Sequence, residues 1–208
     1  NSPDYAFTVS DESLVLGITG QQDEFKIDSA DAGKEVIDNF SIAEGDHLNL
    51  SHLLNSSSHV TAKIHLDQDP NTVPTTSVFL ELGGTTYEIA SLNNVEQGLP
   101  DLVANHASGV DFPTALNGSS WTDVVDVGSN HGGPSAITAA DQASLADNGF
   151  TNNGGDWTLM IKSGTAVVDE VNKQVNFTSD HANNEIVITT ADGATHDITN
   201  VDKVQWHG

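Results

Sequence analysis

The segment Ile18–Leu54 reads ITGQQDEFKIDSADAGKEVIDNFSIAEGDHLNLSHLL, and it decides the fold that we expect. Carboxylates recur beside glycines in this segment, and single apolar residues stand between them. The spacing is typical of a chain that coils through short strands, with apolar side chains inside and carboxylate oxygens at the turns. Carboxylate oxygens on such loops suit calcium, which takes roughly six to eight oxygen ligands.

The segment therefore predicts calcium ligands. The candidate metal ligands within it are Asp23, Asp28, Asp31, Glu35, Asp38 and Asp46. The alternative is that aspartates such as Asp28 and Asp31 cap turns through their side chains, as this residue often does. A second candidate is the pair Asp67 and Asp69, which is spaced like the opening of an EF-hand loop but lacks the downstream Gly and Glu.

The same segment resembles a known family in two places. QDEFKIDSADAG, at 22–33, resembles the last, degenerate copy of the nonapeptide of repeats-in-toxin proteins, G-G-x-G-x-D-x-U-x. VIDNFSIAEGDHLNLSHLL, at 36–54, resembles the unit that follows those repeats in type I-secreted adhesins and serralysin-like proteases. Further on, SWTDVV, GDWTLMIKSG and DITNVDKVQW resemble the C-terminal regions of giant bacterial surface adhesins.

The chain departs from the family pattern at defined positions. No intact nonapeptide is present, Asn39 replaces the Asp of the usual D-F, and Asn49 replaces the Asp of the usual L-D-L-S. Each replacement keeps a carbonyl oxygen but removes a negative charge. Two interpretations follow: a calcium site weaker than those typical of the family, or a cap that closes a solenoid.

The resemblance implies a non-catalytic, calcium-dependent extracellular domain of a type I-secreted bacterial adhesin. Such a domain supports folding and secretion, takes Ca²⁺ as its cofactor, engages the type I secretion machinery, and binds a glycan or peptide on a host or neighbouring cell. Its location would be secreted or at the cell surface. Two alternatives stay open: the noncatalytic C-terminal domain of a secreted protease or lipase, and a dedicated glycan- or peptide-binding module.

Charge and composition limit the function classes. Six Lys and Arg residues stand against thirty Asp and Glu, a net charge of −24. Because such a surface repels phosphates, we expect no nucleic-acid partner. Calcium loading, a high-salt habitat or simple solubility would each explain the acidity. The chain has no cysteine, which excludes a disulfide scaffold, and no apolar run of the roughly 18–20 residues that span a membrane.

Turn residues punctuate short stretches of β character along the chain, so the predicted fold is mostly β. We expect a degenerate-repeat or β-roll-like cap over 1–60 and an antiparallel β-sandwich-like module over 61–208, with a sub-boundary near 108–119. From Asp156 onward, short strands with turns at 8–12-residue spacing are typical of a sandwich. Two short helices are predicted, at Pro100–His106 and at Thr138–Asp147.

No catalytic motif is present. The chain contains neither H-E-x-x-H nor G-x-S-x-G, so we expect no enzyme. Four of its nine histidines gather in one region but lack the spacing of metal ligands, and we expect them at the surface or in turns. They are His47, His52, His59 and His65.

A ligand platform is a weaker hypothesis. Trp121 and Trp157 each precede a β stretch, in Ser-Trp-Thr and Asp-Trp-Thr contexts. An aromatic face beside carboxylates could hold a sugar or a peptide end, although most tryptophans in such places belong to the core. The candidate ligand-binding residues are Trp121, Asp123, Asp126 and Trp157.

Overall fold

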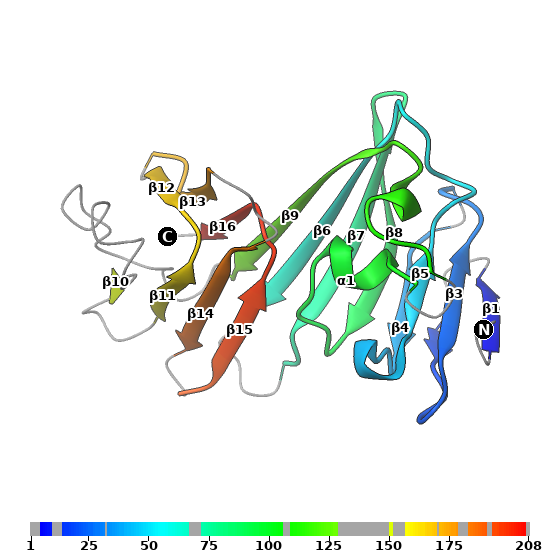
Figure 1. The fold of residues 1–208 in the computed structure, drawn as a ribbon, viewed down its shortest axis with the longest axis horizontal. Coiled ribbons are helices and arrows are strands. Elements are labelled where there is room, and N and C mark those ends of the chain that lie inside the picture. Colours follow the sequence, from blue (N-terminus) through cyan, green and yellow to red (C-terminus); the bar gives the residue numbers. More distant parts are fainter. Residues whose placement is uncertain are drawn as a thin grey trace. The chain divides into compact units, whose positions relative to one another are not determined.

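The computed structural model describes residues 5–9, 14–31, 33–66, 72–105, 109–128, 150–151, 157–169, 171–178, 183–190 and 193–206. Strands dominate these residues, and helices are few and short, so the mostly β prediction is confirmed (Figure 1). The chain divides into two compact units. The first joins Asn1–Lys63 with Thr75–Thr122, and the second joins Ile64–Pro74 with Asp123–Gly208. The expected domain boundary after residue 60 stays a prediction.

The first unit opens with a solenoid-like segment, called the coil below, whose strands form two parallel stacks (Figure 1). One stack has the order β1 (Tyr5–Val9), β3 (Asp23–Ile27), β5 (His47–Asn49). The other places β2 (Leu14–Leu16) beside β4 (Glu35–Asp38) and β4 beside β8 (Thr85–Asn93). All of these neighbours run parallel. Because successive strands from β1 to β5 change stack each time, this portion winds as the predicted β-roll-like segment would.

Alternation along β3 explains how the coil packs. Phe25 and Ile27 are buried at 0% and 1% exposure, while Glu24 and Lys26 between them are only partly buried. Successive side chains of a strand point to opposite faces, so one face of β3 joins the core and the other stays accessible. Leu48, on the neighbouring strand β5, and Leu50, just after that strand, belong to the same core.

The rest of the first unit is a sheet with one helix. The strand order there is β9 (Ser120–Val127), β6 (His59–Leu66), β7 (Thr75–Leu82), β8, β4, β2, and only residues 120–122 of β9 and 59–63 of β6 belong to this unit. Strands β7 and β8 form an antiparallel hairpin that turns at Gly83 and Gly84, whose φ angles are 58° and 82°. Within the described residues, no helix is long and apolar enough to cross a membrane.

The helix α1 (Leu99–Val103) contacts β5 and buries Leu99, Leu102 and Val103 (Figure 1). It is shorter than the predicted helix Pro100–His106, because Ala104 is already extended, with φ −67° and ψ 129°. Two 3-10 turns, Ile42–Glu44 and Thr114–Leu116, complete the helical content of this unit's described residues.

The second unit contains two sheets whose buried residues share one core. One sheet has the order β10 (Phe150–Thr151), β11 (Trp157–Ser163), β14 (Glu185–Thr190), β15 (Thr195–Thr199), and its neighbours are antiparallel. The other has the order β12 (Ala166–Asp169), β13 (Gln174–Phe177), β16 (Lys203–Trp206), β9, β6. Buried Leu159 and Ile186 from the first sheet join Val175 and Val204 from the second in one core. The predicted helix Thr138–Asp147 lies outside the described residues.

Candidate functional site

Two of the predicted metal ligands, Asp23 and Asp46, close turns of the coil. Asp23 Oδ2 accepts the N–H of Ile18 at 2.6 Å, and Asp46 Oδ2 accepts the N–H of Ser41 at 2.8 Å. In each turn the donor stands five residues before the aspartate. Both aspartates are buried, at 0% and 2% exposure. Each therefore satisfies a backbone donor of its own turn, as aspartate often does in turns.

Asp46 also joins one coil to the next. Its Oδ1 accepts the N–H of Asp23 at 2.8 Å, so one carboxylate bonds two backbone donors from two turns. Burial raises the pKa of the Asp46 carboxyl above its usual value, although the N–H groups of Ser41 and Asp23 act in the opposite direction. The negative charges of Asp23 and Glu44 raise this pKa further.

The other predicted metal ligands are spread over the coil. Glu35 is buried on β4 at 1% exposure, and Asp38, at the end of the same strand, accepts a 2.6 Å hydrogen bond from Asn93 Nδ2. Asp28 is exposed and pairs with Lys26 at 3.2 Å. Asp31 is exposed in the turn between β3 and β4. Asp67 and Asp69 lie outside the described residues.

A calcium ion does not fit the buried carboxylates of the coil. Asp23 Oδ2 and both carboxylate oxygens of Asp46 accept backbone N–H groups, whereas calcium needs roughly six to eight oxygen ligands around one point. In the described part of the chain, no three or more His, Cys, Asp or Glu side chains are grouped so as to hold a metal. The exposed Asp28 and Asp31 are the described carboxylates on which a calcium site could still be built.

The predicted ligand-binding residues lie in different surroundings. Trp121 is half-buried and packs edge-on against Phe112, with ring centroids 4.6 Å apart. Asp123 is buried, and its N–H donates to Asp202 Oδ2 at 2.6 Å. Asp126 lies 3.3 Å from His65 Nδ1.

Strand alternation explains part of this separation. Residues 123 and 126 are an odd number of positions apart on β9, so Asp123 and Asp126 face opposite sides of the strand. The backbone of Trp157 belongs to β11, but its side chain lies outside the description.

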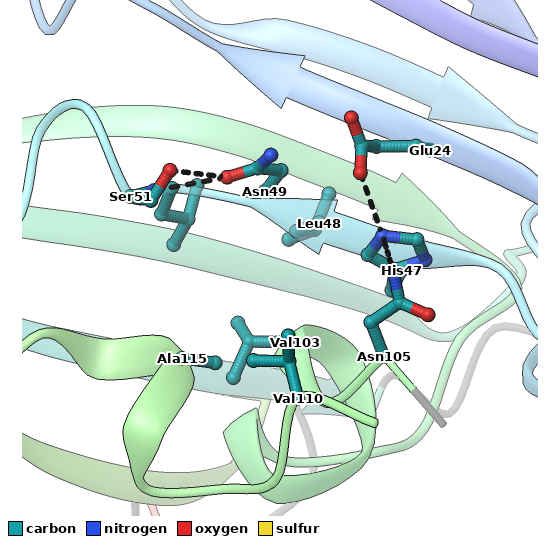
Figure 2. A pocket seen from close by; sticks show the side chains of 10 residues that line it. Glu24, His47, Leu48, Asn49, Ser51, Val103, Asn105, Val110 and Ala115 are labelled. Carbon is teal, nitrogen blue, oxygen red and sulfur yellow. Dashed lines mark hydrogen bonds and ion pairs between the residues drawn. The ribbon is translucent and has the colours of Figure 1, made fainter. Parts of the chain in front are cut away.

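The structure instead forms a cavity of about 290 Å³ in the first unit, against β5 and the segment that follows α1 (Figure 2). Its polar lining gathers at one end around His47, with Asn49 and Ser51 farther along (Figure 2). The full lining is Glu24, His47, Leu48, Asn49, Leu50, Ser51, Val103, Asn105, Val110 and Ala115.

Three side chains meet at the His47 ring. Its Nε2 lies 3.1 Å from Glu24 Oε2 and 2.9 Å from the side-chain amide of Asn105, and its Nδ1 lies 3.4 Å from the carbonyl oxygen of Gly45. The His47 side chain is 3% exposed and that of Glu24 20%. Glu24 and His47 are register partners in the parallel β3–β5 pair, so backbone pairing places them side by side.

Serine and histidine of the cavity are not joined as nucleophile and base. Ser51 Oγ donates to Asn49 Oδ1 at 2.7 Å, whereas the ring nitrogens of His47 lie within hydrogen-bond distance of Glu24, Asn105 and Gly45. The arrangement can hold a cation or a polar group, and it gives no direct route for proton transfer from Ser51 to His47.

The sequence analysis missed this site, and its placement of His47 at the surface or in a turn was wrong. His52 is exposed and His59 and His65 are partly buried, but pairing with β3 and cover from the α1 segment bury His47. A signal was present: Ile18–Ile27 and Ser41–Leu50 place Asp23 and Asp46, and then Glu24 and His47, at equivalent positions 23 residues apart. Nothing local in the sequence connects Asn105 to this pair.

Comparison with family models, with curated proteins and with solved structures gives no match for this chain. Function is therefore inferred from the coil and the cavity.

Proposed function

We propose that this chain is a non-catalytic, calcium-dependent extracellular domain of a type I-secreted bacterial adhesin. The observation that supports the proposal is the number of residues that separates paired positions on stacked strands, which we call the step. Tyr5 of β1 pairs with Asp23 of β3, so this coil advances 18 residues (23 minus 5), twice the nine-residue repeat of repeats-in-toxin proteins. Two stacks of parallel strands, visited alternately, are what two such repeats per coil would build.

The later steps support a role as the closing part of a roll. Leu14 pairs with Val36, a step of 22 (36 minus 14), and Glu24 pairs with His47, a step of 23 (47 minus 24). The coil thus lengthens beyond two repeats as it proceeds. In this proposal the buried aspartates Asp23 and Asp46 hold the lengthened turns through backbone hydrogen bonds, where an intact repeat would use metal ions.

Calcium in this proposal acts at the exposed turn between β3 and β4. Asp28 and Asp31 both stand there, and Gly33 has a φ of 93°, so the chain bends sharply beside two carboxylates. Oxygen ligands on a bent loop are what calcium takes in preference to nitrogen or sulfur ligands. Bound calcium would relieve repulsion between these carboxylates and compete with Lys26 for Asp28.

The test is a titration of chelator-treated protein with calcium, with magnesium at equal ionic strength as the reference. We expect calcium to raise the melting temperature more than magnesium does, with heat of binding in calorimetry. The Asp28→Asn, Asp31→Asn double variant should lose this difference. A control with the same charge change, Glu81→Gln with Asp111→Asn, should keep it. Equal melting curves in calcium and magnesium for the unaltered protein would refute the calcium dependence.

A binding module is the second candidate, and the cavity at His47 is the observation that favours it. Its volume of about 290 Å³ is near the lower end of the roughly 300–1,000 Å³ typical of small-ligand pockets, so its occupant would be small. Its described lining residues include no Trp, Tyr or Phe, so they offer a sugar ring no aromatic face of these three kinds.

A further inference from the structure

We propose that Glu24, His47 and Asn105 form a binding site for a divalent transition-metal ion such as zinc. The site differs from the calcium site proposed above in residues, metal and location, and it does not depend on that function. Its ligands would be the Glu24 carboxylate, the Nε2 atom of His47 and the side-chain oxygen of Asn105. The remaining coordination positions would face the cavity.

The spacing of the three side chains suits one small ion. Ligand atoms about 2.0–2.1 Å from zinc, at angles of about 90–110°, lie about 2.8–3.4 Å from one another. Nε2 of His47 lies 3.1 Å from Glu24 Oε2 and 2.9 Å from the Asn105 amide. The nitrogen and oxygen of an Asn amide have nearly the same shape, so a rotation of the amide by half a turn presents its oxygen to the ion. Little movement is needed to bind.

The surroundings of the His47 ring leave a position for a cation. In the tautomer whose Nδ1–H donates to the Gly45 carbonyl, Nε2 is an acceptor that lies 2.9 Å from the Asn105 amide and 3.1 Å from Glu24 Oε2. A metal ion bound to both Nε2 and the carboxylate would offset the repulsion between these two acceptors. A backbone carbonyl that holds the second ring nitrogen is the usual support for a histidine that binds a metal.

The fold supplies preorganisation and access. Glu24 and His47 are fixed by strand pairing, and the His47 side chain is almost fully buried. Figure 2 shows the Glu24, His47 and Asn105 side chains converging from three segments at one end of the cavity. Imidazole nitrogen favours transition metals over calcium and magnesium, and a net charge of −24 raises the local concentration of cations.

The experiment is a zinc titration of metal-free protein by calorimetry, with cobalt as a probe whose visible absorption reports its ligands. We expect zinc binding that weakens about tenfold or more in Glu24→Gln and in His47→Gln, since each removes a ligand. Asn105→Asp should tighten binding by about tenfold, because it adds a charged oxygen. Far-ultraviolet circular dichroism checks that each variant is folded.

Two controls separate this site from general attraction to an acidic surface. His52→Gln removes an exposed histidine, and Glu81→Gln removes one exposed negative charge, as Glu24→Gln removes one in the cavity. Neither should change zinc affinity or the cobalt spectrum. The proposal is overturned if the unaltered protein binds no zinc, if Glu24→Gln binds zinc with the affinity of the unaltered protein, or if Asn105→Asp fails to tighten binding. If His47→Gln fails to fold, Asn105→Asp still decides the test. If calcium proves to have no effect on the melting temperature, the zinc proposal is not affected.

Discussion

Asp46 is the residue on which the coil depends most. Its two oxygens accept the N–H groups of Asp23 and Ser41 at 2.8 Å each, and its side chain is buried with them. A buried N–H without a partner costs about 1–3 kcal/mol, so a carboxylate that satisfies two of them offsets a large penalty. The same two bonds tie consecutive turns together, which connects one residue to the stacking of β3 and β5.

We expect Asp46→Ala to lower the free energy of unfolding by about 2–4 kcal/mol, since two buried N–H groups lose their acceptor. Asp31→Ala removes an exposed aspartate of the same coil and should change the free energy of unfolding by no more than about 0.5 kcal/mol. Urea unfolding of both variants measures this. Equal midpoints for the two variants would show that the Asp46 bonds add little to stability.

The pKa of Asp46 also predicts a pH dependence. Burial raises this pKa in the folded state above the usual value of 3.8, so the folded protein holds the proton more tightly than the unfolded chain does. The resulting stabilisation is complete below the unfolded pKa and is lost as pH rises through the folded pKa. The stability difference between the unaltered protein and Asp46→Ala should therefore grow when pH falls from 7 toward 4. Urea unfolding at several pH values gives this difference, and a difference that shrinks on acidification would contradict the assigned direction.

At the scale of elements, the coil repeats one design twice. Ile18–Ile27 and Ser41–Leu50 each combine a turn, an aspartate that accepts an N–H from five residues back, and a strand with buried alternate residues. Side-chain bonds also link the two turns: Glu44 Oε1 accepts the N–H of Gly20 at 2.9 Å, and Gln22 Nε2 donates to the carbonyl of Gly45 at 3.1 Å. Stacking thus rests on turn-to-turn bonds as well as on strand pairing.

Gly17 lies where the end of β2 approaches the end of β4 too closely for a side chain. Its N–H donates to the carbonyl of Asp38 at 2.9 Å, and a Cβ there would lie 2.5 Å from the carbonyl oxygen of Asn39. We expect Gly17→Ala to cost about 2–3 kcal/mol, because backbone must move apart. Gly20→Ala has open space around it and should cost only about 1 kcal/mol of backbone strain, since its φ is +81°. Thermal melting ranks the two, and the reverse order would count against the close approach.

Much of the element pattern could be predicted from sequence, because it depends on local signals. Turn residues at 8–12-residue spacing predicted short strands from Asp156 onward, and the structure has strands β11 to β16 there. The predicted end of α1 was wrong. Ala104 already has an extended backbone, and it is neither proline nor glycine, so the sequence gives no local signal for the end of the helix. The site was harder still. Asn105 reaches His47 across 58 residues, and only the packing of the α1 segment on β5 brings the two together.

At the scale of the whole chain, charge is the dominant property. Thirty acidic residues face six Lys and Arg, and in the described part of the chain the lysines that form salt bridges are Lys26, Lys34 and Lys162. Most carboxylates of the chain therefore have no lysine or arginine to balance them. Self-repulsion of this kind opposes the compact state and weakens as salt screens it.

Sodium chloride should therefore raise the melting temperature by a few degrees between low salt and about 0.3 M, where the screening length falls below about 10 Å. The comparison needs chelator present, so that screening is measured apart from any specific cation. A melting temperature that stays constant or falls over this range would show that charge repulsion does not limit stability.

The turn-closing role of Asp23 and Asp46 is tested most directly by amide hydrogen exchange, followed by NMR in the presence of chelator. The amides to watch are those of Ile18, Asp23 and Ser41, the three donors to these carboxylates. We predict that all three exchange slowly without calcium, at rates comparable with amides inside β3. Exchange as fast as in an unstructured peptide, with protection appearing only when calcium is added, would show that metal and not aspartate closes these turns.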